Sequence, residues 1–137
     1  MVEVPATAMT TSLSLRHLPP LAASPYGYEL HVDGEPRQLT AAVELAGYRV
    51  VQESLTNAIR YAPGAATRVH LAYRADGVMV DVIDDGPGTL TARTAGQGGG
   101  TGLAGLRERA HLAGGWLEAA SGPEEGFAVR AFLPDTR

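Results

Sequence analysis

The chain has 137 residues, a length that suits one folded domain, and 45% of them are hydrophobic, which is enough to bury a sizeable core. The formal net charge of −4 and the scattered arginines argue against a nucleic-acid surface, which normally shows a basic stripe. The absence of cysteine excludes disulfides and thiolate metal sites, and it fits a reducing compartment. There is no apolar run of about 18 residues and no basic leader followed by an apolar block. We therefore expect neither a transmembrane segment nor a signal peptide.

The first 25 residues show little pattern. They are rich in Ser, Thr and Ala, and four prolines interrupt them: Pro5, Pro19, Pro20 and Pro25. We expect residues 1–25 to be a linker or a partly ordered arm, and residues 26–137 to form the folded domain. Within that domain, residues 28–32 alternate enough to predict a strand, and Asp33-Gly34 is a turn signal.

A long helix is predicted next. Thr40 is a suitable N-cap, the helix then runs to about Tyr61, and Ala62-Pro63-Gly64 ends it. Apolar side chains recur at helical spacing, which predicts that one face of the helix packs on a sheet. These positions are Val43, Ala46, Val50, Leu55, Ala58 and Ile59.

One stripe of this helix is polar. Glu53 and Asn57 lie four residues apart and share a face, and Arg60 reaches the same edge. The Asn57 carbonyl is a hard oxygen ligand suited to Mg²⁺, Arg60 can meet phosphate charge, and Glu53 can act as a general base. The alternative is a solvated helix face. The apolar neighbours and the mediocre helix propensity of Asn disfavour that alternative.

The remaining elements are four strands and a second helix. The strands are predicted at residues 68–73, 78–83, 116–119 and 127–133, the first two joined by a hairpin turn at residues 75–77. Residues 89–100 are rich in Gly, Thr and Ala and cannot bury enough surface to be rigid, so we expect a mobile loop over a ligand. The second helix is predicted at residues 102–112, closed by Gly114-Gly115.

The sequence Asp-Asp-Gly-Pro-Gly at residues 84–88 follows a predicted buried strand. A carboxylate at the position of Asp84 is costly unless a donor satisfies it, and the amino group of adenine is a matching donor. Gly86 and Gly88 would let the backbone pass close under the base. The alternative is an ordinary strand-to-turn ending, because the same residues are good turn formers.

A second glycine-bearing segment precedes the second helix. Gly98, Gly100 and Gly102 leave backbone N–H groups near a helix N-terminus, where the helix dipole favours an anion. The hydroxyl of Thr101 could add a donor, and Leu103 follows. Taken alone, the segment could equally be a flexible linker before an accidental helix start.

In this order, the three motifs resemble the ATP-binding domain of sensor histidine kinases, within the wider superfamily (GHKL) of gyrase, heat-shock chaperones and mismatch-repair proteins. Gln-Glu-Ser-Leu-Thr-Asn at residues 52–57 and Gly-Leu-Ala-Gly-Leu-Arg-Glu-Arg at residues 102–109 are most similar to the two-component kinases that pair with response regulators of the LuxR/NarL type. The resemblance covers roughly residues 28–133. It implies the Bergerat fold, a two-layer α/β sandwich with a mixed, mostly antiparallel sheet covered on one face by helices.

The resemblance also implies ATP and Mg²⁺ as ligands. It assigns catalysis to Glu53, the metal to Asn57, and adenine recognition to Asp84. Relatives often have His at the position of Tyr61, whose phenol can still donate a hydrogen bond. The full predicted nucleotide site is Asn57, Arg60, Tyr61, Asp84, Gly86, Gly88, Gly98, Gly100, Thr101, Gly102 and Leu103.

The implied activity is transfer of the ATP γ-phosphoryl group to a histidine on a separate dimerisation domain, in the same or another chain, with a response regulator as indirect partner. His17 is followed by Leu18-Pro19-Pro20, which does not match a phosphoacceptor, so we expect this chain to lack its own. The expected location is the cytoplasm, either for a stand-alone protein or for the cytoplasmic portion of a larger membrane sensor. Two alternatives stay open: a serine kinase of the anti-sigma-factor type, and a non-catalytic, nucleotide-gated interaction module.

Overall fold

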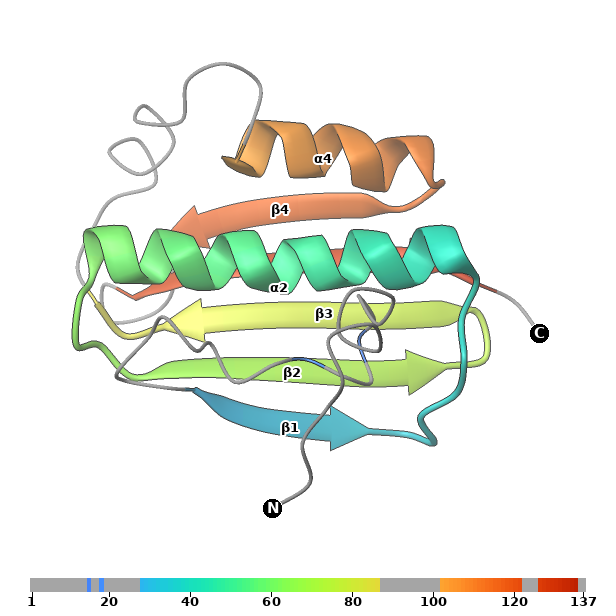
Figure 1. Ribbon diagram of the computed structural model, residues 1–137, viewed down its shortest axis with the longest axis horizontal. Helices are drawn as coiled ribbons and strands as arrows, with labels where there is room; N and C mark the ends of the chain where they lie inside the picture. The colour runs from blue at the N-terminus through green and yellow to red at the C-terminus, as the bar shows by residue number, and fades with distance from the viewer. Residues whose placement is uncertain (1–14, 16–17, 19–27, 87–101, 122–125, 136–137) are drawn as a thin grey trace, which may run out of the picture.

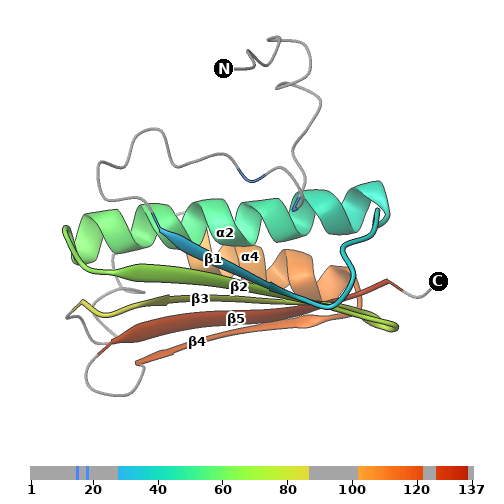
Figure 2. The same ribbon diagram turned by 90° about the horizontal axis from the view of Figure 1, so that it is seen from below.

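The computed structural model describes residues 15, 18, 28–86, 102–121 and 126–135. The elements follow one another as β1 (Glu29–Asp33), α2 (Ala41–Tyr61), β2 (Thr67–Arg74), β3 (Gly77–Asp84), α4 (Gly102–Leu112), β4 (Trp116–Ser121) and β5 (Phe127–Pro134). The strands form one five-stranded sheet in the order β1-β2-β3-β5-β4. Both helices lie on one face of this sheet, and the opposite face carries no helix among the described residues (Figures 1 and 2). The predicted two-layer sandwich is confirmed.

The sheet is mixed in the predicted sense. The edge strand β1 pairs with β2 in parallel, whereas β2 with β3, β3 with β5, and β4 with β5 are antiparallel. Side chains alternate between the two faces, so Val69 and Leu71 of β2 are buried under the helices while Arg68 is exposed on the open face. This alternation decides which polar residues can meet the helices.

Helix α2 begins and ends close to the predicted positions. Thr40 is its N-cap, and the Thr40 hydroxyl accepts a hydrogen bond from the Val43 N–H at 3.4 Å. The buried stripe of α2 includes Val50, Val51 and Leu55, which join the core of the sheet. The periodicity of the sequence therefore identified the face of α2 that packs on the sheet.

Helix α4 matches its predicted bounds and is closed as expected. Gly114 has a positive φ of 90°, a conformation that favours glycine at a helix end. The N–H of Gly114 donates to His111 O at 2.9 Å, and the N–H of Gly115 donates to Ala110 O at 2.8 Å. The two glycines thus satisfy carbonyls at the end of the helix and turn the chain into β4.

The end of β5 is tied to the start of α2. Asp135 is buried, and its Oδ2 accepts a hydrogen bond from the Thr40 N–H at 2.6 Å. Arg37 donates to the backbone carbonyl of Asp135 at 2.6 Å and to that of Arg74 at 2.8 Å. These bonds fix the segment that enters α2 against the β2–β3 hairpin and the last strand.

Two residues before β1 also belong to the packed structure. Leu15 is only 2% exposed, and Leu18 packs against the same core. Both lie before residue 26, the predicted start of the domain, and that boundary stays a prediction. The predicted mobile loop at residues 89–100 lies outside the described residues. Within the described part of the chain, no helix is both long and apolar enough to cross a membrane.

Candidate functional site

The described parts of all three sequence motifs meet at one end of the molecule. Figure 1 shows the C-terminal end of α2, the end of β3 and the start of α4 on the same side. Directly after β3, the N–H of Asp85 donates to Ala66 O at 3.0 Å, which joins the turn after β3 to the segment after α2. Residues that are distant in the sequence therefore converge where a nucleotide was predicted.

Gly86 is the closest link between the β3 turn and α2. A Cβ atom on Gly86 would overlap the Cβ of Ala62 and would lie 3.0 Å from that of Ala65. Only a residue without a side chain lets the two segments approach this closely. The sequence predicted that Gly86 passes under a bound base. The structure adds a second role, close packing on the end of α2, which the local motif did not reveal.

Asp84 ends the buried side of β3. Its side chain is 4% exposed, and its Oδ1 accepts a hydrogen bond from the Gly86 N–H at 3.0 Å. This bond is the turn chemistry that the sequence offered as an alternative. It also fixes the carboxylate at the end of the sheet beside the end of α2, so the turn and an adenine contact are compatible.

The polar side chains along one stripe of α2 differ in how deeply they are buried. Asn57 is 4% exposed, Glu53 and Tyr61 are half-buried, and Arg60 is exposed. Among the described residues, the hydroxyl of Ser54, one turn before Asn57, is buried with no hydrogen-bond partner. Polar groups are therefore concentrated in the C-terminal half of a helix that otherwise supplies core residues. Asn57 lies deepest, and Arg60 faces solvent, where it can meet a charged ligand.

The start of α4 supplies the third part of the site. Gly102 has a φ of 70°, in the left-handed region that favours glycine, and Leu103 is buried in the core. Leu103 thus fixes the first turn of α4 to the domain. Four predicted site residues, Gly88, Gly98, Gly100 and Thr101, lie outside the described residues and stay predictions.

The side chains at this end fit a magnesium nucleotide. The buried Asn57 carboxamide offers a hard oxygen, and the partly buried Glu53 carboxylate lies on the same face one turn earlier. Helix α4 begins at the same end of the molecule (Figure 1), and the first N–H groups of a helix favour an anion. This arrangement can hold a cation and phosphates at the end of the sheet where the Asp84 carboxylate is buried.

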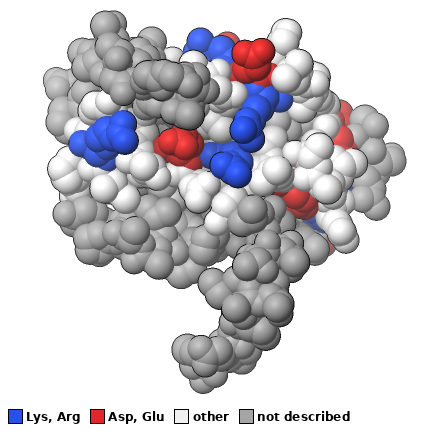
Figure 3. Space-filling view, turned by 45° about the horizontal axis from the view of Figure 1, so that its top comes forward, with Lys and Arg blue, Asp and Glu red and all other residues white. Residues whose placement is uncertain are grey.

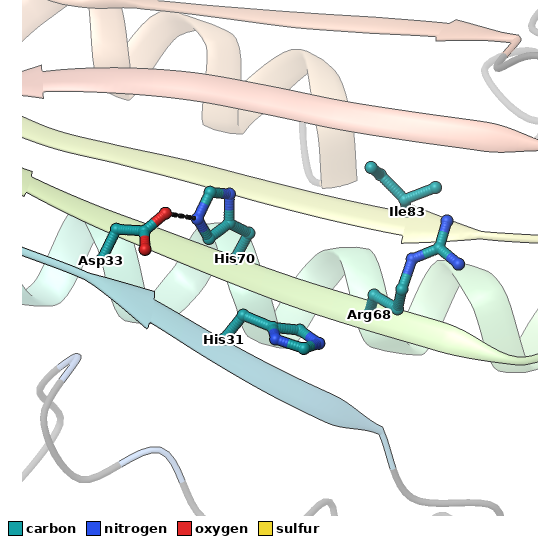
Figure 4. A pocket seen from close by; sticks show the side chains of 5 residues that line it. All are labelled: His31, Asp33, Arg68, His70 and Ile83. Carbon is teal, nitrogen blue, oxygen red and sulfur yellow. Dashed lines mark hydrogen bonds and ion pairs between the residues drawn. The ribbon is translucent and has the colours of Figure 1, made fainter.

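A different hollow lies on the open face of the sheet. It measures about 350 Å³ and is lined by His31, Asp33, Arg68, His70 and Ile83 (Figure 4). His70 pairs with Asp33 at 2.6 Å, and Asp81 lies 3.9 Å from the other ring nitrogen. Because Asn57 and Asp84 are buried on the helix side, this hollow is separate from the predicted nucleotide site.

Charges on the visible surface are interleaved. Figure 3 shows acidic and basic side chains side by side among uncharged residues, without a continuous basic stripe on that face. On the open face, Arg130 pairs with Asp81 at 3.2 Å. An ion pair with one partner at the surface, as Arg130 is, contributes little to stability.

The pKa of one described tyrosine departs from its usual value. Burial raises the pKa of Tyr28 above the ordinary 10.0, and the neighbouring Tyr48 raises it further, because two phenolates would repel each other. Tyr28 directly precedes β1 and packs against the core. It is not one of the predicted site residues.

The comparisons with known proteins agree with this geometry. The model of the family described as histidine kinase-, DNA gyrase B-, and HSP90-like ATPase matches residues 42–137. The sensor histidine kinase LnrJ of Bacillus subtilis is 34% identical over 103 residues, which are 75% of this chain and 24% of that protein. The oxygen sensor histidine kinase NreB of Staphylococcus carnosus is 32% identical over 106 residues, 77% of this chain and 30% of that protein. The chain thus spans less than a third of the length of these relatives.

Solved structures share the fold. The ATP-binding domain of PrrB from Mycobacterium tuberculosis superimposes with a TM-score of 0.62 at 22% identity, covering 93% of this chain and 95% of that one. The mycobacterial sensor histidine kinase MprB gives a TM-score of 0.58 at 24% identity, covering 80% and 84%. The histidine kinase domain of the Escherichia coli osmosensor EnvZ gives 0.59 at 22%, covering 80% and 76%.

Proposed function

The chain belongs to the family of histidine kinase-, DNA gyrase B- and HSP90-like ATPases, and on that premise we propose that it is the Mg-ATP-binding catalytic domain of a sensor histidine kinase. One observation carries the proposal. The end of α2 with its buried Asn57, the end of β3 with its buried Asp84, and the start of α4 meet at one end of the sheet.

Each residue has a role in phosphoryl transfer, which depends mainly on positioning and charge neutralisation. Asn57 would hold Mg²⁺, which when bound would neutralise phosphate charge. The Asp84 carboxylate accepts a hydrogen bond from the amino group of adenine. Glu53 removes the proton from the attacking imidazole, as a general base on the same helix face as Asn57. The N–H groups at Gly102 and Leu103 face the phosphates.

The remaining residues of the proposed site are assigned from the sequence motifs. Arg60 and Tyr61, at the end of α2, would meet phosphate oxygens. Gly98, Gly100 and Thr101 would cover the phosphates, and Gly88 would lie under the base. The acceptor in this proposal is a histidine on a separate dimerisation domain, and a response regulator of the LuxR/NarL type receives the phosphoryl group next. The proposed location is the cytoplasm.

Phosphate transfer from γ-labelled ATP tests the proposal. The isolated chain should bind Mg-ATP without labelling any of its own histidines, and it should label a helical hairpin that carries a phosphoacceptor His. Glu53→Gln keeps the size of the side chain and should lower the transfer rate by about 100-fold or more, with ATP binding retained. Label on a serine-bearing antagonist instead would favour a serine kinase. Tight binding without transfer to either partner would favour an interaction module.

A further inference from the structure

The Leu15 side chain packs on α2 directly over Gly47, and we call this packing position the seat. A Cβ atom on Gly47 would lie 2.6 to 3.0 Å from the terminal carbons of the Leu15 side chain, which is too close for contact. The leucine therefore rests directly against the helix backbone. It is 2% exposed, and it reaches this seat from 32 positions earlier in the chain.

The backbone of Leu15 also contacts α2, through a hydrogen bond. Its N–H donates to Oε1 of Glu44 at 2.8 Å, and the N–H of Leu39 donates to Oε2 of the same carboxylate at 3.0 Å. Glu44 is 7% exposed, so this carboxylate is buried and binds two separate stretches of backbone. Hydrogen bonds to a charged acceptor are stronger than neutral ones, and they cost most when one partner is removed.

Glu44 and Gly47 lie one helical turn apart and form a notch in the first half of α2. We propose that this notch is a docking site for the chain segment that enters the domain, and that its occupation by Leu15 raises the affinity of the domain for Mg-ATP. The notch recognises a branched aliphatic side chain together with the N–H of the same residue. The inference on affinity rests on the proposed function, whereas the inference on docking does not.

Docking of Leu15 is coupled to Mg-ATP affinity because the notch and the proposed metal ligand, Asn57, belong to the same helix. Glu44 and Asn57 are 13 positions apart on α2, about 20 Å along a continuous helix. Docking of Leu15 ties the first half of α2 to the segments before β1 and before α2. A helix fixed at this half loses less freedom when the nucleotide orders the other half, so docking lowers the cost of binding.

The experiment uses the full chain, isotope-labelled, with exchange of the backbone amide at position 15 and Mg-ATP affinity measured on the same samples. Gly47→Ala places a methyl group in the seat while improving helix propensity, so α2 stays intact and the Leu15 side chain has to move away from it. Leu15→Ala empties the seat. Both variants should raise the exchange rate of the amide at position 15 by about tenfold and weaken Mg-ATP binding by about fivefold. By reciprocity, saturating Mg-ATP should slow exchange of the Leu15 amide in the unaltered protein.

Leu112→Ala is the matched control, because it makes the same chemical change at a position 78% exposed on α4. It should change neither the exchange rate of the Leu15 amide nor the affinity for Mg-ATP. Fast, unprotected exchange of the Leu15 amide in the unaltered protein would overturn the docking. Faster exchange in both seat variants with ATP affinity within about twofold of the parent would overturn the coupling. An unaltered protein that binds no Mg-ATP would refute the proposed function and the coupling, while the Leu15 amide would still decide the docking.

Discussion

The two halves of α2 use buried polar side chains for different purposes. In the first half, Glu44 binds the backbone N–H groups of Leu15 and Leu39, so its carboxylate holds the chain together. In the second half, Asn57 is equally buried, and this half of α2 ends on the side of the molecule where β3 ends and α4 begins (Figure 1). Burial of a polar residue alone therefore does not identify a site. What separates the two is whether the group ties backbone segments of its own domain or lies among the motifs that predict a ligand.

The largest effect should come from Asn57→Ala. The substitution removes the proposed magnesium ligand, so Mg-dependent ATP binding should weaken by about 1000-fold, or about 4 kcal/mol. The free energy of unfolding without nucleotide should fall by about 1 kcal/mol, the typical effect of a single substitution, which is much less than the loss of Mg-ATP binding. Titration calorimetry with and without Mg²⁺ measures the first quantity and urea denaturation the second. Unchanged affinity would show that the second half of α2 is not the metal site.

Glu44→Ala tests the other half of the comparison. Two backbone N–H groups lose a charged acceptor inside the protein, so the free energy of unfolding should fall by about 3 kcal/mol. Urea denaturation provides the measurement. The matched variant Glu108→Ala removes an exposed glutamate from α4 and should leave stability within about 0.5 kcal/mol. Equal stability of the two variants would mean that Glu44 is not a clamp.

Asp84→Asn should have a smaller effect that concerns the base. Asparagine keeps the shape and can still accept a hydrogen bond, but it loses the charge that favours the adenine amino group. ATP affinity should therefore drop by about tenfold, or about 1.4 kcal/mol, and the preference for ATP over GTP should shrink. Calorimetry with both nucleotides checks this. A loss that is equal for ATP and GTP would argue that Asp84 acts on the fold and not on the base.

The smallest effect concerns Tyr28, outside both halves of α2. Its pKa in the folded state is raised by burial and by Tyr48, so above about pH 10 the folded protein retains a proton that the unfolded chain has lost. The contribution of Tyr28 is therefore fully present below the unfolded pKa and is lost as the pH rises through the folded pKa. Tyr28→Phe should make the alkaline loss of stability shallower, measured by urea denaturation between pH 8 and 11, roughly two units below and one above the tyrosine pKa. An identical pH profile would contradict the assignment.

The sequence predicted the local elements well because their signals are local. Thr40 and Pro63 mark the two ends of α2, and hydrophobic spacing identifies its buried face. The long-range contacts had no such signal. Nothing near Gly47 in the sequence indicates that Leu15 packs on it, and nothing near Gly86 indicates Ala62. Glu44 could have been noticed as a charge among the buried positions of α2, but its partners are set by tertiary structure.

Only part of the candidate site could be predicted, again because the sequence carries local signals and not long-range contacts. Asn57 and Asp84 were identified from motifs, and the structure brings their elements together. Arg60 was expected on the same stripe, yet it is exposed, because the stripe runs from the core to solvent along the last turns of α2. Gly88, Gly98, Gly100 and Thr101 remain predictions from the sequence, since they lie outside the described residues.

A crystal structure of the chain with Mg²⁺ and a non-hydrolysable ATP analogue tests the central proposal most directly. We predict that the adenine amino group lies within hydrogen-bond distance of Asp84, that the metal contacts the Asn57 carbonyl, and that the phosphates meet the first turn of α4. An analogue bound instead in the open-face hollow near His70, or with its metal far from α2, would contradict the account.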